Sequence, residues 1–573
     1  MPSEIRESLF DGRLFESKSV VHFELGGCKR IEMPLQDSGS KIVDIHGNLG
    51  VQFHFLKVNA GDGYAEFTLG DYGAVSQCLH TSEMGILLRV KKEDREYTIW
   101  LPPGADKCRF DKYKRIEKNN SQRIPSQAEV FPRICLKIKR PESFGEVVTF
   151  AYVVYDDPTG QFYQELAHLQ DVERRHYMKS EWFSVRAPSD VWKYLLDGSI
   201  YDPRADKRIG KRFKCQQCAY SLWSYFGFLN LETGKQVYDI MQDEIAFSVL
   251  KDMGSNGEWG HGFWSDDIET HARFHLDGLH LLISQYEKTQ EPMWLQAVER
   301  GVSFLSLNLM EQLDNGSLWF LHDTIEYLDK RCHFKSTLFG KSIGNSLCIN
   351  THVQALTVLF RLRQYHSEKH NYAEMFERGL RSLRRVLACK SGEPFFKVLV
   401  PWIVRNITWT DCNSNVGRVV RALEASLLRG LYWQLRRQFP RIVQPGGFTE
   451  RDLTLAFFSH SYHVSNMKDF LTLYQQEPIP WLRDYIEDGI KFACNFVKKM
   501  GVKKALRSGV HYVELIDVLY LYNKLISAKF EFEINMLEKE IYEEMAGYSL
   551  DCCILKSEQR SRNGCVKRGL HPN

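Results

Sequence analysis

The sequence of 573 residues has little that would direct it to a membrane or out of the cell. No uninterrupted apolar run is long enough to cross a bilayer, which excludes an integral membrane segment. Residues 1–7 are charged and lack the apolar core of a signal peptide, so secretion is not expected. The 14 cysteines lack the dense, regular spacing of a disulfide framework. We therefore expect a cytoplasmic protein with free thiols.

The sequence also lacks an excess of charge of one sign. Its 75 basic and 72 acidic residues leave a formal net charge of +3, which provides no long-range attraction for nucleic acid or anionic lipid. One basic stretch lies between Lys556 and Lys567, and we expect it to be a solvated tail. The sequence therefore predicts no nucleic-acid partner, and it contains no signal for the oligomeric state.

Several signatures of cofactor and metal chemistry are missing. There is no P-loop, no Gly-x-Gly-x-x-Gly after a strand and no Gly-x-Ser-x-Gly elbow. Cys215 and Cys218 form a Cys-x-x-Cys pair, but no second pair stands at zinc-finger spacing. His271 and His275 are four residues apart, which suits a metal, yet no obvious third ligand accompanies them. We predict neither a cofactor nor a metal site.

Aromatic residues, by contrast, are abundant. They make up 13% of a sequence whose 43% hydrophobic and 26% charged residues are typical of a globular protein. A pyranose ring presents an apolar face that stacks on Trp or Tyr, so this content suits saccharide binding as well as core packing. The length predicts at least two domains, unless one of them is a barrel or toroid.

The first part of the chain, residues 1–160, has a hydrophobic period near two. Residues 51–57 and 64–69 alternate between apolar and polar, and Gly, Asp and Asn separate such stretches. Short alternating strands with turn residues between them predict an antiparallel β-sandwich, with one face of each sheet buried and one wet. Residues 161–212 are predicted to be a linker with helices.

The second part, residues 213–546, has helical periodicity and an internal repeat. Three segments share one layout, in which a helix ends near a Tyr, a tight connection follows, and a second helix carries Glu-x-Gly. The tyrosines are Tyr286, Tyr365 and Tyr474, and the glycines are Gly301, Gly379 and Gly489. Gly inside a helix costs about 1 kcal/mol relative to Ala, so its recurrence predicts a close approach of two helix backbones.

Further helical pairs extend the repeat. Residues 213–229 with 236–253 and residues 511–525 with 530–545 form two more, and residues 415–439 begin another. About six hairpins predict an (α/α)6 toroid, with an open solenoid as the alternative. Residues 547–573 are left as the basic C-terminal tail.

The connections between hairpins are long, whereas those within hairpins are short. In a toroid all the long connections gather at one end, above the N-termini of the inner helices, where functional residues are commonly placed. The long connections are residues 254–267, 314–347, 390–414 and 440–462.

These connections and the helix starts beside them concentrate Trp, His, Asp and Asn. The candidate catalytic residues are Asp267, His271, His322, Asp323, His352 and His463. The candidate substrate-binding residues are Trp259, Trp264, Trp319, Asn350, Arg405, Asn406 and Tyr462. Thr270-His271 and Thr351-His352 recur at comparable helix starts, which a repeated cap with a packed His also explains.

With this layout the chain resembles the six-hairpin carbohydrate enzymes, in which a β-sandwich precedes an (α/α)6 barrel. Several glycoside hydrolases and polysaccharide lyases have this plan, and the plan of the glucuronyl C5-epimerases is similar. The resemblance covers residues 19–545 and is carried by the Tyr and Gly repeat. It implies a carbohydrate-active enzyme by analogy of plan, because fold does not fix function.

Four functions compete. An epimerase or lyase acting on a uronate-containing saccharide, in cell-surface polysaccharide metabolism, needs an acid or base and a group that holds the carboxylate, and the His, Arg and Asn candidates suit it. A glycoside hydrolase or phosphorylase needs two carboxylates. The carboxylate candidates are Asp266, Asp267, Glu269, Asp323, Glu326 and Asp411. A non-catalytic binding scaffold would need no convergent ionisable groups, and a zinc toroid of the lanthionine-cyclase kind would need metal ligands.

Overall fold

The structure is a computed structural model in which two compact units are distinguished. The first comprises Met1–Met178, Trp182–Ser255 and Ser284–Glu299, and the second comprises Lys179–Glu181, Asn256–Ile283 and Arg300–Asn573. The residues it describes are 5–6, 20–25, 28–35, 39–68, 74–81, 84–117, 122–124, 127–129, 135–169, 178–179, 184–185, 188–203, 210–263, 268–313, 315–324, 335–336, 340–341, 348–365, 371–388, 419, 423, 426–427, 459–500 and 512–546.

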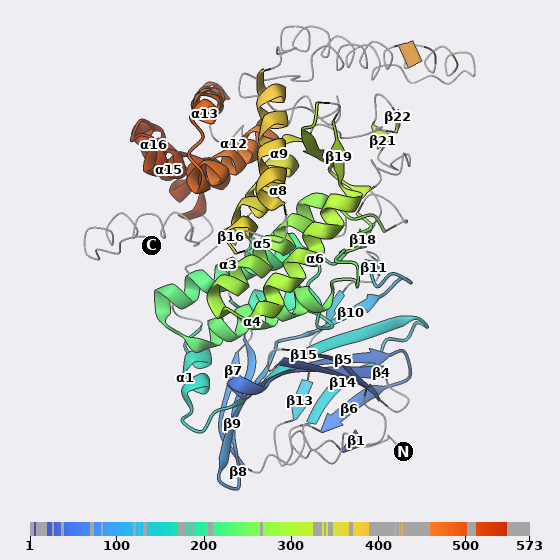
Figure 1. Cartoon of the computed structure of the whole chain (residues 1–573). Helices are drawn as coiled ribbons and strands as arrows, with labels where there is room; N and C mark the ends of the chain where they lie inside the picture. Colours follow the sequence, from blue (N-terminus) through green and yellow to red (C-terminus); the bar gives the residue numbers. More distant parts are fainter. Residues whose placement is uncertain are drawn as a thin grey trace. The chain divides into compact units, whose positions relative to one another are not determined.

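The first unit is built around a ten-stranded sheet (Figure 1). Its main path is β2 (Val20–Leu25), β3 (Cys28–Leu35), β4 (Gly39–His46), β5 (Val51–Asn59), β15 (Glu146–Asp156), β9 (Arg95–Leu101), β8 (Gly85–Lys92) and β7 (Ala74–Thr81). Strand β10 (Ala105–Arg109) pairs with β15 and with β12 (Gln122–Ile124). The paired strands of this sheet are antiparallel, as the alternating pattern predicts.

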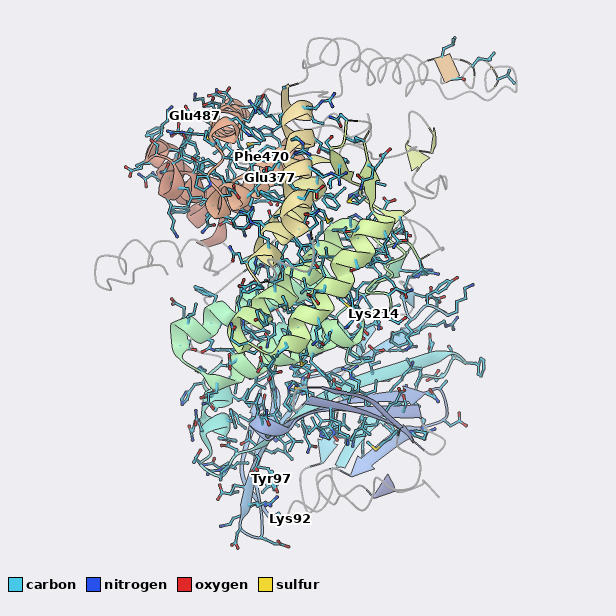
Figure 2. The ribbon with its side chains drawn as sticks, viewed as in Figure 1. Lys92, Tyr97, Lys214, Glu377, Phe470 and Glu487 are labelled. Atoms are coloured by element: carbon cyan, nitrogen blue, oxygen red, sulfur yellow. The ribbon has the colours of Figure 1, made fainter. Side chains whose placement is uncertain are left out.

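A smaller sheet contributes to the same hydrophobic core. Its order is β1 (Ile5–Arg6), β6 (Tyr64–Thr68), β14 (Cys135–Lys139) and β13 (Gln127–Glu129), with β1 and β6 parallel. Ala65 of β6 and Leu136 of β14 pack in one cluster with Phe150 of β15 and Tyr97 of β9. Figure 2 labels Tyr97, which is buried in this core, and Lys92, which is exposed at the end of β8. The two sheets therefore share one core.

The expectation of one wet face fails for the central strand. Every residue of β15 from Glu146 to Tyr155 is buried, so both faces of the strand are covered. On one face, Phe150 and Tyr152 belong to the core shared by the two sheets. The sheet is thus a middle layer at this strand, and an alternating sequence could not reveal a second covering layer.

Helices and short elements complete the first unit. Helices α3 (Gln216–Thr233) and α4 (Gln236–Lys251) form the predicted early hairpin, which Gly234 closes with a left-handed φ of 71°. The helix α1 (Gln161–Ala167) packs against α4 and β8. The short elements are η2 (Gly47–Leu49), β11 (Ile116–Glu117), β16 (Met178–Lys179), β17 (Ser184–Val185), η4 (Pro188–Lys193) and β18 (Lys211–Arg212).

Helical hairpins dominate the rest of the chain. They are α5 (Ala272–Thr289) with α6 (Pro292–Asn308), α8 (Ile349–Arg363) with α9 (Tyr372–Ala388), α12 (Ser459–Gln476) with α13 (Pro480–Met500), and α15 (Tyr512–Leu525) with α16 (Glu531–Ala546). Pro292 and Pro480 are each the first residue of a helix, where the missing N–H costs nothing. Two small pairs, β19 (Met310–Gln312) with β20 (Leu318–Phe320) and β21 (Lys335–Ser336) with β22 (Gly340–Lys341), lie in one connection.

The first helices of successive hairpins are neighbours in the second unit. Helix α8 packs against α12, and α12 packs against α15, while α9 and α13 are paired with their own first helices. The hairpin expected to begin within residues 415–439 lies outside the described residues apart from four positions, so a closed toroid stays a prediction.

The domain boundaries at residues 160, 212 and 546 stay predictions as well. The described chain combines an antiparallel β region with many helices, which confirms the mixed β and α class. Among the described residues, no helix has the length and apolar character needed to cross a membrane.

Candidate functional site

Three buried histidines join the two helices of three successive hairpins. The Nε2 atom of His275 is 3.0 Å from the carbonyl oxygen of Gly301, and His352 makes the same contact with Gly379 at 3.0 Å. His463 and Gly489 repeat it at 2.7 Å. We call these three residues the interhelical histidines. They explain why the Glu-x-Gly repeat has a glycine at this position.

The glycines are needed because a large side chain occupies the space beside each carbonyl. A Cβ atom at Gly301 would clash with Leu279, one at Gly379 with Leu356, and one at Gly489 with Met467. Each of these residues stands four positions after its interhelical histidine, on the same face of the first helix. Each glycine therefore makes room for a side chain of the first helix, and the close approach of two helix backbones expected from the sequence stays a prediction.

The contact also corrects the register of the repeat. His352 was aligned with His271 from their Thr-His dipeptides, but the residue that occupies its position in the first hairpin is His275. His271 precedes helix α5, whereas His352 is the fourth residue of α8. The two Thr-His dipeptides therefore match by chance, because they stand at different positions relative to the first residue of their helices.

His352 has both ring nitrogens bonded to the backbone. Its Nδ1 accepts a hydrogen bond from the N–H of Phe320 at 3.1 Å, and its Nε2 donates to Gly379. Burial lowers the pKa of His352, His275 and His463 to about 4 in each case. These imidazoles are neutral at pH 7, and His352 has no nitrogen left for a substrate. We therefore remove His352 from the catalytic candidates, whereas a catalytic role for His463 stays a prediction.

Two of the predicted sugar-stacking rings lie against the same histidines. Trp319 stacks on His352 with ring centroids 3.9 Å apart and an interplanar angle of 5°, and Trp259 contacts His275 edge-on at 5.1 Å. Both indoles are about 2% exposed. A buried indole that already faces an imidazole offers no surface for a pyranose, so the structure gives these residues a packing role.

His271 and His322 form a different arrangement, which we call the histidine pair. Their ring centroids are 4.2 Å apart in an edge-to-face contact. The backbone brings them together, because Ala272 N–H donates to the His322 carbonyl at 2.8 Å and His271 forms a β-bridge with Asp323. His271 N–H also donates to Nδ1 of His261 at 3.0 Å. Two residues from different connections are thus fixed side by side at the start of α5.

The histidine pair also touches the start of α8. Nδ1 of His322 is 3.0 Å from the hydroxyl of Thr351, in the first turn of that helix. Asn350, the second residue of α8, accepts from Thr351 N–H at 2.8 Å and from the thiol of Cys348 at 2.8 Å, so its side chain is held in the first turn of the helix. The N-termini of two helices therefore flank the histidine pair, and their partial positive charge favours an anionic ligand.

The structure unites some predicted residues and leaves others undescribed. It brings together His271, His322, Asp323 and Asn350, all of which are buried. Glu269, a carboxylate candidate, is buried nearby, and its carbonyl accepts from the N–H of His261 at 2.9 Å. The residues outside the described part are Trp264, Asp266, Asp267, Glu326, Arg405, Asn406 and Asp411, together with the side chain of Tyr462.

Arg273 is a residue beside the site that the sequence did not single out. Its Nη1 donates to the carbonyl of Asn350 at 3.1 Å and to Asp469 of α12 at 2.7 Å. Burial alone would lower the pKa of Arg273, but Asp469 and Asp277 raise it, so the guanidinium stays charged. A polar residue every third or fourth position on α5 (Arg273, Asp277, His280) was the signal that could have revealed it.

Among the described residues, one group could hold a metal ion. Ligand atoms of Asp202, Cys215 and Cys218 lie within 4.8 Å of one another, and all three residues are buried. The Cys-x-x-Cys spacing in the sequence indicates the two thiol ligands, whereas only the fold brings the carboxylate of Asp202 beside them. Arg212 donates to the backbone oxygen of Asp202 at 2.7 Å, and its nearby positive charge opposes a cation. We keep the prediction of no tightly bound metal, which stoichiometric zinc in elemental analysis of the purified chain would contradict.

Comparisons with known proteins give neighbours in solved structures alone. No protein-family model matches the chain. No curated protein matches it either. It is similar to a D-mannose isomerase, with 11% identity over 61% of this chain and 78% of that one and a TM-score of 0.35. A sugar epimerase from a ruminal bacterium matches with 11% identity over 50% and 76% of the two chains and a TM-score of 0.26.

A polysaccharide lyase matches at 9% identity, over 90% of this chain and 80% of that one, with a TM-score of 0.26. The names of all three neighbours describe enzymes that act on carbohydrates. Similarities with TM-scores this low carry no argument about the chemistry of this chain. The function proposed below therefore rests on the site alone.

Proposed function

We propose that this chain is a carbohydrate-active enzyme that moves a proton on a uronate-containing saccharide, as an epimerase or a lyase. The observation that carries the proposal is the histidine pair, two imidazoles whose ring centroids are 4.2 Å apart beside the first turns of α5 and α8. Imidazole is the side chain whose ordinary pKa suits both taking and giving a proton near neutral pH. Cell-surface polysaccharide metabolism is the setting we propose for it.

In this mechanism one imidazole of the pair, uncharged, takes the proton from the carbon next to the sugar carboxylate. The carbanion that forms is delocalised onto the carboxylate, which must be held by positive charge. The N-terminal ends of α5 and α8 supply such charge beside the pair, and the partly buried Arg273, two residues after His271, keeps its guanidinium charged.

Because the two imidazole rings of the histidine pair are in contact, both would act on the same face of the sugar. If the protonated pair passes the proton to the departing glycosidic oxygen on that face, the C–O bond breaks, a C=C bond forms, and the enzyme is a lyase. If a group outside the pair returns a proton from the opposite face, the configuration inverts and the enzyme is an epimerase. The pair supports the first step of both.

The test is a panel of uronate-containing and neutral oligosaccharides assayed with purified protein. A lyase produces an unsaturated, ultraviolet-absorbing uronate, and an epimerase incorporates solvent deuterium at the abstracted carbon. His271→Ala and His322→Ala should each lower turnover by roughly 10²–10⁴-fold, the usual worth of a positioned acid or base.

The matched control is His261→Ala, which removes a third buried imidazole, one that accepts the His271 N–H and packs edge-on against Phe274. It should lower turnover far less than the two pair variants, with circular dichroism confirming the fold of all three. Activity confined to neutral substrates and lost with carboxylate variants would indicate a hydrolase instead. Full activity in both pair variants would remove the proposal.

A further inference from the structure

The first unit contains a second cluster of ionisable residues, which the proposed function does not use. Arg30, Asp44, His46 and Glu244 are each at most 2% exposed. Arg30 pairs with Asp44 and also donates to the carbonyl of Gly198 at 3.0 Å. Four ionisable side chains in one dry place are expensive to bury, and such clusters concentrate at functional sites.

A thiol extends this cluster toward the surface. Sγ of Cys28 is 3.3 Å from Nδ1 of His46, and Nε2 of His46 donates to Oε2 of Glu244 at 2.7 Å. Cys28 is half-buried, whereas His46 and Glu244 are buried. We call these three residues the thiol–imidazole–carboxylate chain. A nucleophile bonded to a base, with the base oriented by a third group, is the arrangement that activates a thiol.

The fold produces this chain by strand register and one helix. Cys28 of β3 and His46 of β4 are directly opposite in the sheet, and the alternation of side chains puts Arg30 and Asp44 on the same face. Helix α4 supplies Glu244 from 198 residues further along the sequence than His46. The rings of Phe53 and Phe247 contact His46 edge-on at 5.6 and 5.8 Å and fix its orientation.

The charges around His46 favour its protonated form. Burial alone would lower the pKa of His46, but its hydrogen bonds to Cys28 and Glu244 raise it to about 10. Asp44 is paired with Arg30, and Glu244 is the carboxylate that bonds the imidazole. Burial and the nearby charge of Asp44 raise the pKa of Glu244 to about 7. A proton on His46 beside a thiol stabilises the thiolate, which is the reactive form of cysteine.

We propose that Cys28 is a reactive thiolate, paired with the His46 imidazolium, whose substrate is a small hydroperoxide. The thiolate sulfur attacks one peroxide oxygen, an S–O bond forms and the O–O bond breaks. The sulfur loses two electrons to become a sulfenic acid, and the peroxide is reduced. The leaving oxygen takes the Nδ1 proton of His46 and departs as water or an alcohol. An external thiol restores the cysteine.

The first experiment measures alkylation of the full-length protein by iodoacetamide, with each cysteine resolved by mass spectrometry. Trypsin releases Cys28 on residues 19–29 and Cys78 on residues 58–89, each as the sole cysteine of its peptide. Cys78 is exposed, and burial raises its pKa, so it serves as an ordinary thiol in the same molecule. At pH 6 Cys28 should react roughly tenfold faster than Cys78.

The pH dependence of the alkylation rate distinguishes an ion pair between Cys28 and His46 from a hydrogen bond between neutral groups, and it needs no variant. The rate for Cys28 should depend on pH less than the rate for Cys78, because the ring of His46 lies 3.3 Å from the Cys28 sulfur. The rate for Cys78 should rise about tenfold per pH unit. A Cys28 rate that rises in parallel with that of Cys78 would show a neutral thiol and overturn the proposal.

Variants then test the partners and the substrate. Glu244→Gln keeps the hydrogen bond but removes the charge, and it should restore part of the pH dependence at Cys28 and none at Cys78. Treatment with peroxide and dimedone should give an adduct on Cys28 of the unaltered protein and none on Cys78. A thiol reductant added beforehand should prevent the adduct, and this block should be reversible. If alkylation of Cys28 shows the weak pH dependence but the dimedone adduct does not form, a hydroperoxide is not the substrate of this thiol.

Discussion

Two groups of buried histidines in the second unit differ in what their rings contact. The interhelical histidines donate to the backbone carbonyl of a glycine on the paired helix, and burial holds them neutral. In the histidine pair each ring contacts the other imidazole; the ring of His271 also stacks on Phe274, and Nδ1 of His322 faces a hydroxyl. Burial and residue type are the same in both groups. The partner of the ring, rather than its burial, separates a packing histidine from a candidate catalyst.

The largest predicted effect is a loss of folding stability in acid, which the interhelical histidines cause. Their folded pKa of about 4 lies below the ordinary value of about 6.5, so the neutral form stabilises the fold fully above pH 6.5 and loses this contribution as the pH falls toward 4. Each site is worth up to roughly 3 kcal/mol, at about 1.4 kcal/mol per pKa unit. Urea unfolding at pH 7, 6, 5 and 4 measures the loss.

His352→Gln supplies the control for this titration. Gln cannot be protonated, so the variant should be less stable at pH 7 but should lose less stability between pH 6.5 and 4 than the unaltered protein. Parallel pH profiles for the two proteins would show that His352 titrates normally, and the comparison between the two groups would then fail.

Removing one interhelical histidine should affect stability and leave chemistry alone. His352→Ala deletes two backbone hydrogen bonds and the partner of Trp319, which together are worth about 2–4 kcal/mol. Thermal melting measures that loss, and turnover at a temperature well below the melting point should stay within about threefold of the unaltered protein. A turnover loss as large as that of His322→Ala would place both histidines in the same group.

The smallest effect is expected for the glycine. Gly379→Ala forces a Cβ against Leu356 and should cost about 1–3 kcal/mol. The double variant with Leu356→Ala should cost less than the sum of the two single variants, because the shortened side chain makes room for the methyl group. Additive costs in urea unfolding would show that the clash is relieved elsewhere and that glycine serves another purpose here.

The repeat was readable from the sequence because its members recur locally. Tyr286 and Gly301 are close along the chain, and their spacing recurs in Tyr365 with Gly379 and Tyr474 with Gly489. The interhelical histidines were equally readable in principle. His275, His352 and His463 stand 26 or 27 residues before their glycines. A dipeptide match at Thr270-His271 concealed this longer spacing.

The two candidate sites depend on contacts between distant residues. His271 and His322 were both named from their connections, but their contact follows from a β-bridge that no periodicity encodes. Cys28 was not named, because its partner His46 is set by a hairpin register and Glu244 by a helix far along the chain. Sequence patterns locate elements, whereas such pairings depend on how the elements pack.

Arg273 has a consequence for how the protein is synthesised. One guanidinium joins α5 to the carbonyl of Asn350 and to Asp469, which is 196 residues further along the chain. At ordinary translation rates of about 5–20 residues per second, roughly 10–40 s pass before that carboxylate leaves the ribosome. During this interval the earlier hairpins carry a cation that lacks its eventual counter-ion. Docking of α12 is therefore the step at which Arg273 gains this counter-ion, and ribosome-bound chains that end before α12 should be more sensitive to protease than longer ones.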